Sequence, residues 1–304
     1  MEGETGGDPI SGIKWSRRST RNLERELKRQ GHPIGRDTVG RLLGAEGFSL
    51  RANVKRLSGS RHPDREQQFQ VIRKKRKAAG RKGIPLLSVD TKKKEIIANY
   101  HNAGRIWVGQ PIEVADHDFP HPELGRAHPF GLYDVGRNRG MVVVGTSAQT
   151  AAFGVDALRI WYRTEGQVEY PEAREIQIFC DNGGCNGSKN RLWKYELQDF
   201  ADECDLAVHV THFPPRASKW NPIEHRLFSF ISKNWAGQPL TSYEKMLKYI
   251  RTTRTETGLT VRASLSRKQY ETGIEISDEQ MSEINLRWGR VLPQWNYTIR
   301  PRPN

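Results

Sequence analysis

Three acidic residues stand where they could act together on a phosphodiester. Asp90 ends an apolar run that begins at residue 84, and Asp181 ends the apolar run of residues 176–180. Glu224 lies at the start of a predicted helix. Carboxylates on strand ends and on a helix start can converge at one edge of a sheet and supply the hard oxygen ligands that Mg²⁺ requires. We therefore expect this trio to bind a pair of Mg²⁺ ions, or Mn²⁺, for phosphodiester chemistry.

Each of these acids also has a purely structural interpretation. Asp90 could start a turn, and residues 181–184 (Asp-Asn-Gly-Gly) are ordinary turn formers. Glu224 follows Asn221 and Pro222, which fit the N-cap and the first helical position, so it occupies the capping-box site, where Glu stabilises a helix by about 1 kcal/mol. The capping role and the metal-binding role of Glu224 compete for one side chain.

Three cations near these acids are candidate contacts to DNA phosphates. Lys92 opens a run of three lysines directly after the first acid, and Lys219 and Arg226 flank the third acid. Lys and Arg commonly position a nucleic-acid backbone without reading its sequence. The alternative for Lys92 is a solvated charge run.

Strands that alternate with helices must position these residues. The pattern predicts strands over residues 84–90, 131–135, 141–145, 176–180 and 206–210. It predicts helices over residues 149–163, 190–204, 242–253 and 278–290, and a further helix from residue 221. Early antiparallel strands followed by β-α units that add parallel strands give an α/β fold, a mixed sheet flanked by helices. This is the strand order of the ribonuclease-H-like fold.

Composition excludes several classes of protein. The chain has 304 residues, of which 36% are hydrophobic, enough for a sizeable core. No apolar run approaches the roughly 20 residues that cross a bilayer, and the start is acidic and Gly-rich, unlike a secretory signal. Three cysteines cannot all pair within one chain. We expect a soluble cytoplasmic protein with reduced thiols and no membrane partner.

Positive charge is concentrated near the N-terminus. Residues 14–82 contain 21 Lys or Arg against 6 Asp or Glu, and most of the net charge of +14 therefore lies there. Such a segment attracts polyanions, and double-stranded DNA is the partner that we expect. The alternative is a solvated tail whose charge only aids solubility.

Two short helices are predicted in this basic segment. The first runs from Thr20 to Gln30 after a Ser19 N-cap, and the second from Arg36 to about Ala45, with Val39, Leu42 and Leu43 facing inward. Helices joined by a tight turn are typical of a helix-turn-helix, whose second helix enters the major groove. Arg36, Thr38 and Arg41 would then face DNA. A plain helical packing unit is the alternative.

Long stretches of the chain resemble one known family, the DDE transposases of insertion sequences, and most closely the ISAzo-type transposases. The resemblance rests on residues 88–95, 179–187, 191–198, 212–229 and 295–299. It implies that Asp90, Asp181 and Glu224 are the catalytic carboxylates. It also implies metal-dependent DNA strand cleavage and strand transfer, with DNA element ends and target DNA as substrates.

The resemblance implies a domain organisation as well. We expect a helix-turn-helix-type DNA-binding segment over residues 1–60, a basic linker over 61–82, and a ribonuclease-H-like catalytic domain with C-terminal helices over 83–304. Family members usually carry more helix-turn-helix structure before the segment that matches Gly7-Asp8-Pro9, so an N-terminally truncated protein is expected. A homo-oligomer, associated with the nucleoid when bound to DNA, follows by the same likeness.

Two other functions remain open from the sequence. One is a non-catalytic DNA-binding protein derived from a transposase, for which Asp181→Asn would change neither metal binding nor cleavage. The other is a ribonuclease-H-like nuclease, which would hydrolyse strands without joining them. The basic N-terminal segment favours the transposase over the nuclease, because a simple nuclease needs no helix that reads a groove.

Overall fold

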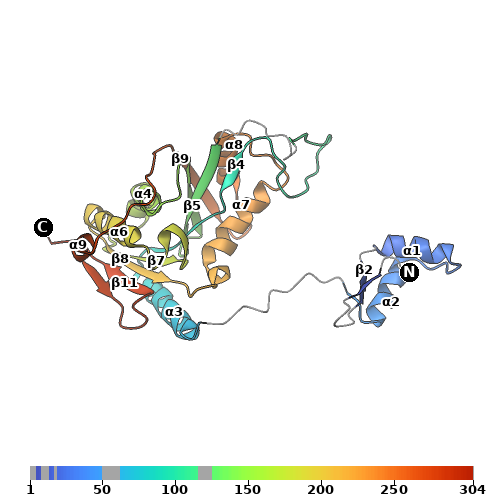
Figure 1. The fold of residues 1–304 in the computed structure, drawn as a ribbon, viewed down its shortest axis with the longest axis horizontal. Helices are drawn as coiled ribbons and strands as arrows, with labels where there is room; N and C mark the ends of the chain where they lie inside the picture. The colour runs from blue at the N-terminus through green and yellow to red at the C-terminus, as the bar shows by residue number, and fades with distance from the viewer. Residues whose placement is uncertain (1–4, 8–13, 17–18, 50–61, 116–124, 304) are drawn as a thin grey trace. The chain divides into compact units, whose positions relative to one another are not determined.

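The computed structural model describes residues 5–7, 14–16, 19–49, 62–115 and 125–303. The chain divides into two compact units, residues 1–59 and residues 60–304 (Figure 1). Each unit is described by itself. In the part of the chain that is described, no helix is both long and apolar enough to cross a membrane.

The described residues of the first unit form two short strands and two helices. Strand β1 (Thr5–Gly7) pairs antiparallel with β2 (Lys14–Ser16). Helix α1 (Thr20–Arg29) begins where the Ser19 side chain accepts a hydrogen bond from the Asn22 backbone, as the N-cap prediction requires.

Helix α2 (Arg36–Ala45) follows a turn at Gly31, whose φ of +85° favours glycine. The two helices pack through Leu23 and Val39, which are both buried. The prediction that Leu42 faces inward is wrong, because 48% of its surface is exposed. The contact between two short helices is too small to bury Leu42 as well as Val39.

Residues 65–82 form a long helix, α3 (Arg65–Lys82), that ends at Gly83 in a left-handed conformation. One face of α3 buries Gln68, Ile72 and Ala79. The Gln68 side-chain amide donates a hydrogen bond of 2.7 Å to the backbone oxygen of His212 in β8, and this bond attaches the helix to the sheet. This segment, expected as a linker, therefore packs within the second unit, and the expected boundary at residues 60–61 lies outside the described residues.

The second unit is built on one mixed sheet of nine strands. Its strands are β3 (Leu86–Thr91), β4 (Glu95–Ile97), β5 (Gly125–Asp134), β6 (Arg139–Gly145), β7 (Glu175–Cys180), β8 (Ala207–His212), β9 (Thr260–Ser266), β10 (Leu286–Trp288) and β11 (Asn296–Ile299). The order is β10-β11-β8-β7-β3-β5-β6-β9, with β4 beside β5. Strands β3, β5 and β6 are antiparallel neighbours, and β7 and β8 continue the sheet parallel to β3. The predicted ribonuclease-H-like strand order is confirmed.

Helices cover both faces of this sheet. They are α4 (Ala151–Trp161), η1 (Tyr162–Gly166), α5 (Gln167–Glu169), η2 (Gly184–Asn186), α6 (Arg191–Cys204), η3 (Ser218–Trp220), η4 (Glu224–Phe228), α7 (Ser229–Asn234), α8 (Tyr243–Thr252) and α9 (Asp278–Ser282). One apolar core joins α4 and α6 to the sheet, and a second joins η4, α7 and α8 to its other side (Figure 1). Burial of both faces explains the nearly unbroken apolar runs of the central strands.

The helix predicted over residues 278–290 is wrong in its second half. Helix α9 begins with a Ser277/Gln280 capping box and ends at Ser282, and residues 286–288 form β10. The backbone of β10 pairs with β11, which itself extends the sheet from β8. Neither β10 nor β11 was predicted, because pairing with a distant segment leaves little local signal.

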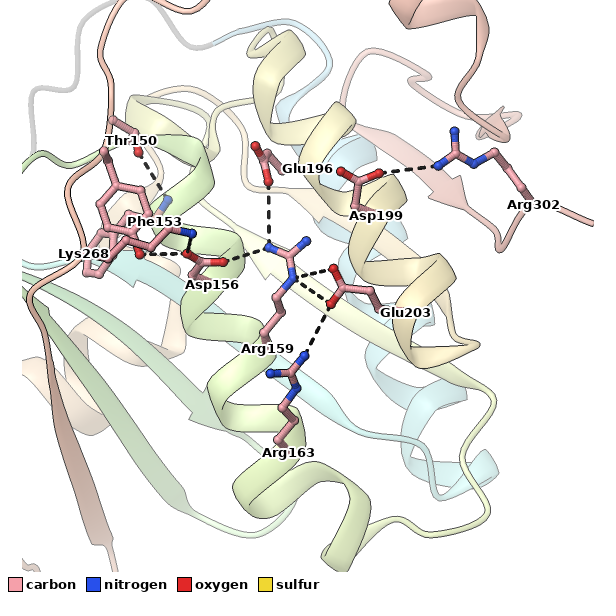
Figure 2. A network of polar contacts seen from close by, with 11 residues as sticks. Thr150, Phe153, Asp156, Arg159, Arg163, Glu196, Asp199, Glu203, Lys268 and Arg302 are labelled. Atoms are coloured by element: carbon pink, nitrogen blue, oxygen red, sulfur yellow. Dashed lines mark hydrogen bonds and ion pairs between the residues drawn. The ribbon is translucent and has the colours of Figure 1, made fainter. Parts of the chain in front are cut away.

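A polar network ties α4 to α6 (Figure 2). Arg159 of α4 donates to Glu203 of α6 at 2.9 Å and to Asp156 at 2.9 Å. Lys268 also donates to Asp156, at 2.7 Å. These groups are partly solvated, so each pair contributes little free energy, but together they fix the orientation of α6.

Candidate active site

Strands β3 and β7 place the first two predicted acids at equivalent positions on neighbouring strands. The two strands are parallel neighbours, and their register pairs Val89 with Cys180, the residues that precede Asp90 and Asp181. Equivalent positions on adjacent parallel strands point to the same face and lie about 4.8 Å apart. The sheet thus brings the two carboxylates to one edge.

The third acid approaches this edge because two strand positions lack side chains. Gly131 pairs with Asp90, and a Cβ there would lie 2.5 Å from the Phe228 ring. A Cβ on Gly140 would lie 2.5 Å from a Leu227 methyl carbon. These glycines let η4 lie directly on the sheet beside Asp90. Glu224 is the first residue of η4, a π-helical turn, and such turns are frequent at functional sites.

A buried relay connects Asp90 to the start of the Glu224 helix. The Asn221 amide nitrogen donates to the Asp90 carboxylate at 3.3 Å, and the Asn221 oxygen accepts from the Ser88 hydroxyl. The Ser88 oxygen in turn accepts from the Ile223 backbone N–H at 3.1 Å. Ser88 and Asn221 are fully buried. The Asn221 side chain is therefore committed to the site, and no capping box with Glu224 is found among the described contacts, which leaves the Glu224 carboxylate available.

A second relay fixes the end of β7. The His212 ring lies 2.9 Å (Nδ1) from the Asp181 backbone oxygen and 3.1 Å (Nε2) from the Tyr297 hydroxyl. Complete burial lowers the pKa of His212 to about 4, so the ring is neutral, with Nδ1–H donating and Nε2 accepting. This bond stabilises the backbone at the position from which Asp181 projects.

The three acids lie near enough to repel one another. Burial, together with the charges of Asp181 and Glu224, raises the pKa of Asp90 to about 7, against hydrogen bonds from the Thr91 backbone and from Asn221 that lower it. Burial also raises the pKa of Asp181 and of Glu224, and the charge of Asp181 adds to the rise at Glu224. Clustered carboxylates of this kind favour a cation.

Carboxylate oxygens are the hard ligands that divalent ions such as Mg²⁺ take in proteins. Among the described residues, no three His, Cys, Asp or Glu side chains are grouped to hold one ion. Mg²⁺ usually takes only one or two protein carboxylates and fills its remaining positions with water and phosphate oxygens. Two carboxylates near one another are therefore enough protein ligands for one such ion.

The predicted phosphate-binding cations differ in their surroundings. Lys92 pairs with Glu95 at 2.8 Å and lies over the Trp235 ring, so its charge is already engaged. Lys219 is exposed above the Trp220 ring, and Arg226 is exposed two residues after Glu224. Arg36, Thr38 and Arg41 belong to the first unit, with both arginines exposed.

Sequence reasoning missed the residues that support the acids. Ser88, Asn221 and Tyr297 received no role in the site, and His212 received none beyond packing. The available signal was the position of polar residues inside otherwise apolar elements, since a buried polar group needs a hydrogen-bond partner. That signal does not name the partner.

The family model described as the Rhodopirellula transposase DDE domain matches residues 1–301. The chain belongs to this family. This membership agrees with the resemblance to DDE transposases that the sequence shows. No protein of curated function matches the chain.

Several solved structures of a transposase are similar to this chain. One is the Mos1 transposase paired-end complex with left transposon end, with 16% identity and a TM-score of 0.47 over 77% of this chain. Another is the Mos1 mariner paired end complex with Mn, with 15% identity and a TM-score of 0.45 over 77% of this chain. The matched region spans 65% of the length of either Mos1 chain.

Proposed function

We propose that this chain is a DDE transposase that cleaves DNA strands at the ends of an insertion sequence and transfers them to target DNA. The observation that carries the proposal is the meeting of Asp90, Asp181 and Glu224 at one sheet edge, where their charges interact. Membership of a transposase DDE domain family supports the same chemistry.

The three acids would hold two Mg²⁺ ions, or Mn²⁺, with Asp90 shared and with Asp181 and Glu224 each completing one site. Such ions would supply positive charge that neutralises the attacking and leaving oxygens. Asn221 and Ser88 orient Asp90, and His212 holds the backbone of Asp181. Lys219 and Arg226 position the DNA phosphates. Water cleaves the phosphodiester at the element's end and frees a 3′-hydroxyl. This hydroxyl attacks a phosphodiester of the target DNA, which breaks and releases a target 3′-hydroxyl, so no covalent intermediate with the protein forms.

The first unit would recognise the element ends. The exposed arginines Arg36 and Arg41 and the half-buried Thr38 lie on α2, the second helix of a tight helix pair, as a major-groove reader requires. We propose that the protein acts as a homo-oligomer, because two ends must be held together, and that it works on DNA in the cytoplasm at the nucleoid.

Strand cleavage and joining test the proposal directly. Purified chain is incubated with Mg²⁺ and DNA bearing the inverted repeats that flank its own gene, beside Asp181→Asn. We expect the substitution to lower cleavage and joining at least about a hundredfold, because one metal site loses a charged ligand. Asp205→Asn, at an exposed position after α6, is the control for a lost charge.

Two outcomes would replace the proposal. Equal activity of the wild type and Asp181→Asn would favour a non-catalytic DNA-binding protein. Cleavage without joining, and without preference for the inverted repeats, would favour a ribonuclease-H-like nuclease.

A further inference from the structure

A groove opens beside the strand end that carries Asp181. It has a volume of about 970 Å³, within the range of ligand-binding sites. One wall is the loop after β7 and the start of α6, and the other is the segment around Trp288 and Trp295 near the C-terminus. Asn182, the residue after Asp181, lies on its lining. The groove thus begins where the candidate active site ends.

The lining of this groove is positively charged. It contains Lys189, Arg191 and Lys194, and none of the described lining residues is acidic. Arg191 pairs with Asp278 at 2.7 Å, whereas no carboxylate of the described residues pairs with either lysine. Helix α6 also begins here without an acidic residue in its first turn, so its N-terminal dipole adds to the positive potential.

Lys194 is the cation that most clearly needs an anion. Only 4% of its surface is exposed, and its ammonium group donates to the backbone oxygens of Ser188 and Asn190. It also lies 5.2 Å from the centre of the Tyr297 ring, the ring whose hydroxyl contacts His212. Burial without a carboxylate partner lowers the pKa of Lys194 to about 8. A bound phosphate would restore the missing counter-charge.

Aromatic surface stands beside this charge. The Trp288 indole is 53% exposed and forms a T-shaped contact with the Tyr297 ring, so about half of its surface is available to a ligand. Trp295, which also lines the groove, is buried and contacts the His62 ring at 4.7 Å. Gly183 adds no side chain to the opposite wall, and a Cβ there would meet nothing within 4 Å. Phosphate-binding cations together with a stacking ring are the features of a site for single-stranded nucleic acid.

We infer that this groove binds unpaired nucleotides of the DNA strand that leaves the active site past Asp181, with the phosphate at Lys189 and Lys194 and a base on Trp288. The inference rests on the proposed function and names a binding site for its substrate. Unpaired nucleotides are required because a base within a duplex has no free face to offer Trp288.

The test compares duplex DNA that carries a short unpaired tail with the same duplex made blunt. Both are bound to the full-length chain in chelator, so that no cleavage occurs, and affinity is followed by fluorescence anisotropy at one fixed salt concentration. We expect the tail to increase affinity about fivefold or more, the effect of one base–aromatic stack. Trp288→Ala and Lys189→Ala should each remove most of that increase and leave blunt-duplex binding unchanged.

Matched controls separate the groove from general DNA binding. Trp107→Ala removes an exposed indole from another loop, and Lys248→Ala removes an exposed cation from α8. Both variants should keep the full effect of the tail. Thermal unfolding checks that each variant is folded, which is expected because all four side chains are exposed.

Photo-crosslinking locates the base. A single 5-iodouracil is moved along the tail, and the crosslinked peptide is identified by mass spectrometry. One tail position should crosslink to the peptide that contains Trp288, and Trp288→Leu should abolish that product. Equal binding of tailed and blunt DNA by the wild type, or equal loss of the tail effect in groove and control variants, would overturn the inference.

The outcome for the groove is independent of the outcome for catalysis. Cleavage and joining without any effect of the tail would overturn the groove and leave the proposed function intact. A tail effect in a wild-type protein that shows no cleavage would support the groove and count against the enzyme.

Discussion

At the scale of single residues, Asn221 has the position of a residue that orients a metal ligand. Its amide oxygen accepts a hydrogen bond from Ser88 and its amide nitrogen donates one to Asp90, and all three side chains are buried. Partners of ligating carboxylates typically contribute a factor of about 10 to 100 in metal affinity or activity. The carboxylate geometry of this site therefore depends on a residue that touches neither metal nor DNA.

We expect Asn221→Ala to weaken Mn²⁺ binding, measured by electron paramagnetic resonance without DNA, by about 10-fold to 100-fold. The same change should lower cleavage in parallel. Asn99→Ala, which removes an amide on the surface loop after β4, is the control. Unchanged Mn²⁺ affinity in Asn221→Ala would show that Asp90 is oriented without it.

The titration of Asp90 predicts how the metal-free protein responds to pH. Its pKa rises from an ordinary value of 3.8 to about 7 in the folded chain, so between these values the folded state holds the proton more firmly than the unfolded state. The free energy of unfolding should therefore fall as pH rises through this window, by at most about 1.4 kcal/mol per pH unit.

Asp90→Asn removes this titration. The stability of the variant relative to the wild type should increase as pH rises from about 4 to about 7, measured by urea unfolding in chelator. Added Mg²⁺ should stabilise the wild type more than the variant. A stability difference that does not change with pH would mean that Asp90 is not buried among like charges.

At the scale of elements, the close contact of η4 with the sheet decides where Glu224 lies. Gly131 and Gly140 remove two side chains from the strand surface, and Phe228 and Leu227 occupy the space. Helix η4 and the strands β5 and β6 are therefore complementary in shape. The π-helical turn adds a local change of direction at Glu224 itself.

Gly131→Ala should push η4 away from strand β5. Its methyl group would lie 2.5 Å from Phe228 and 2.9 Å from Ile223, so we expect a loss of about 1–3 kcal/mol of stability, measured by urea unfolding, and a larger relative loss of cleavage. Gly80→Ala on α3 is the matched control, because a Cβ there meets nothing within 4 Å and should stabilise the helix by about 0.5–1 kcal/mol. Equal behaviour of the two variants would contradict this account of the site.

At the scale of the whole molecule, recognition and chemistry are assigned to different units. The first unit, residues 1–59, carries the proposed groove-reading helix, and the second, residues 60–304, carries the acids. This division predicts that DNA affinity and the catalytic step can be changed separately.

The double variant Arg36→Ala/Arg41→Ala should bind DNA with inverted repeats at least about tenfold more weakly, because base and phosphate contacts are both lost. The slope of log affinity against log salt should decrease by about 1 for each phosphate contact removed. Metal binding by the second unit should not change. Electrophoretic mobility shifts over a series of salt concentrations measure the first two effects, and undiminished preference for the repeats would place recognition elsewhere.

The sequence alone determined the elements and the positions of the acids within them. Apolar periodicity located the central strands and most helices, because both faces of this sheet are covered and local patterns record that burial. Asp90, Asp181 and Glu224 stood out because each follows or begins such an element.

Only the tertiary structure decided what holds these acids in place. Asn221 lies 131 positions from Asp90, and Tyr297 lies 85 positions from His212, so no local pattern connects them. Strand register and the two glycines at the helix contact bring them together. The same physical reason applies to α3 and β10, whose conformations depend on a distant partner. Local sequence encodes which residues are buried, whereas the fold selects the groups against which they are buried.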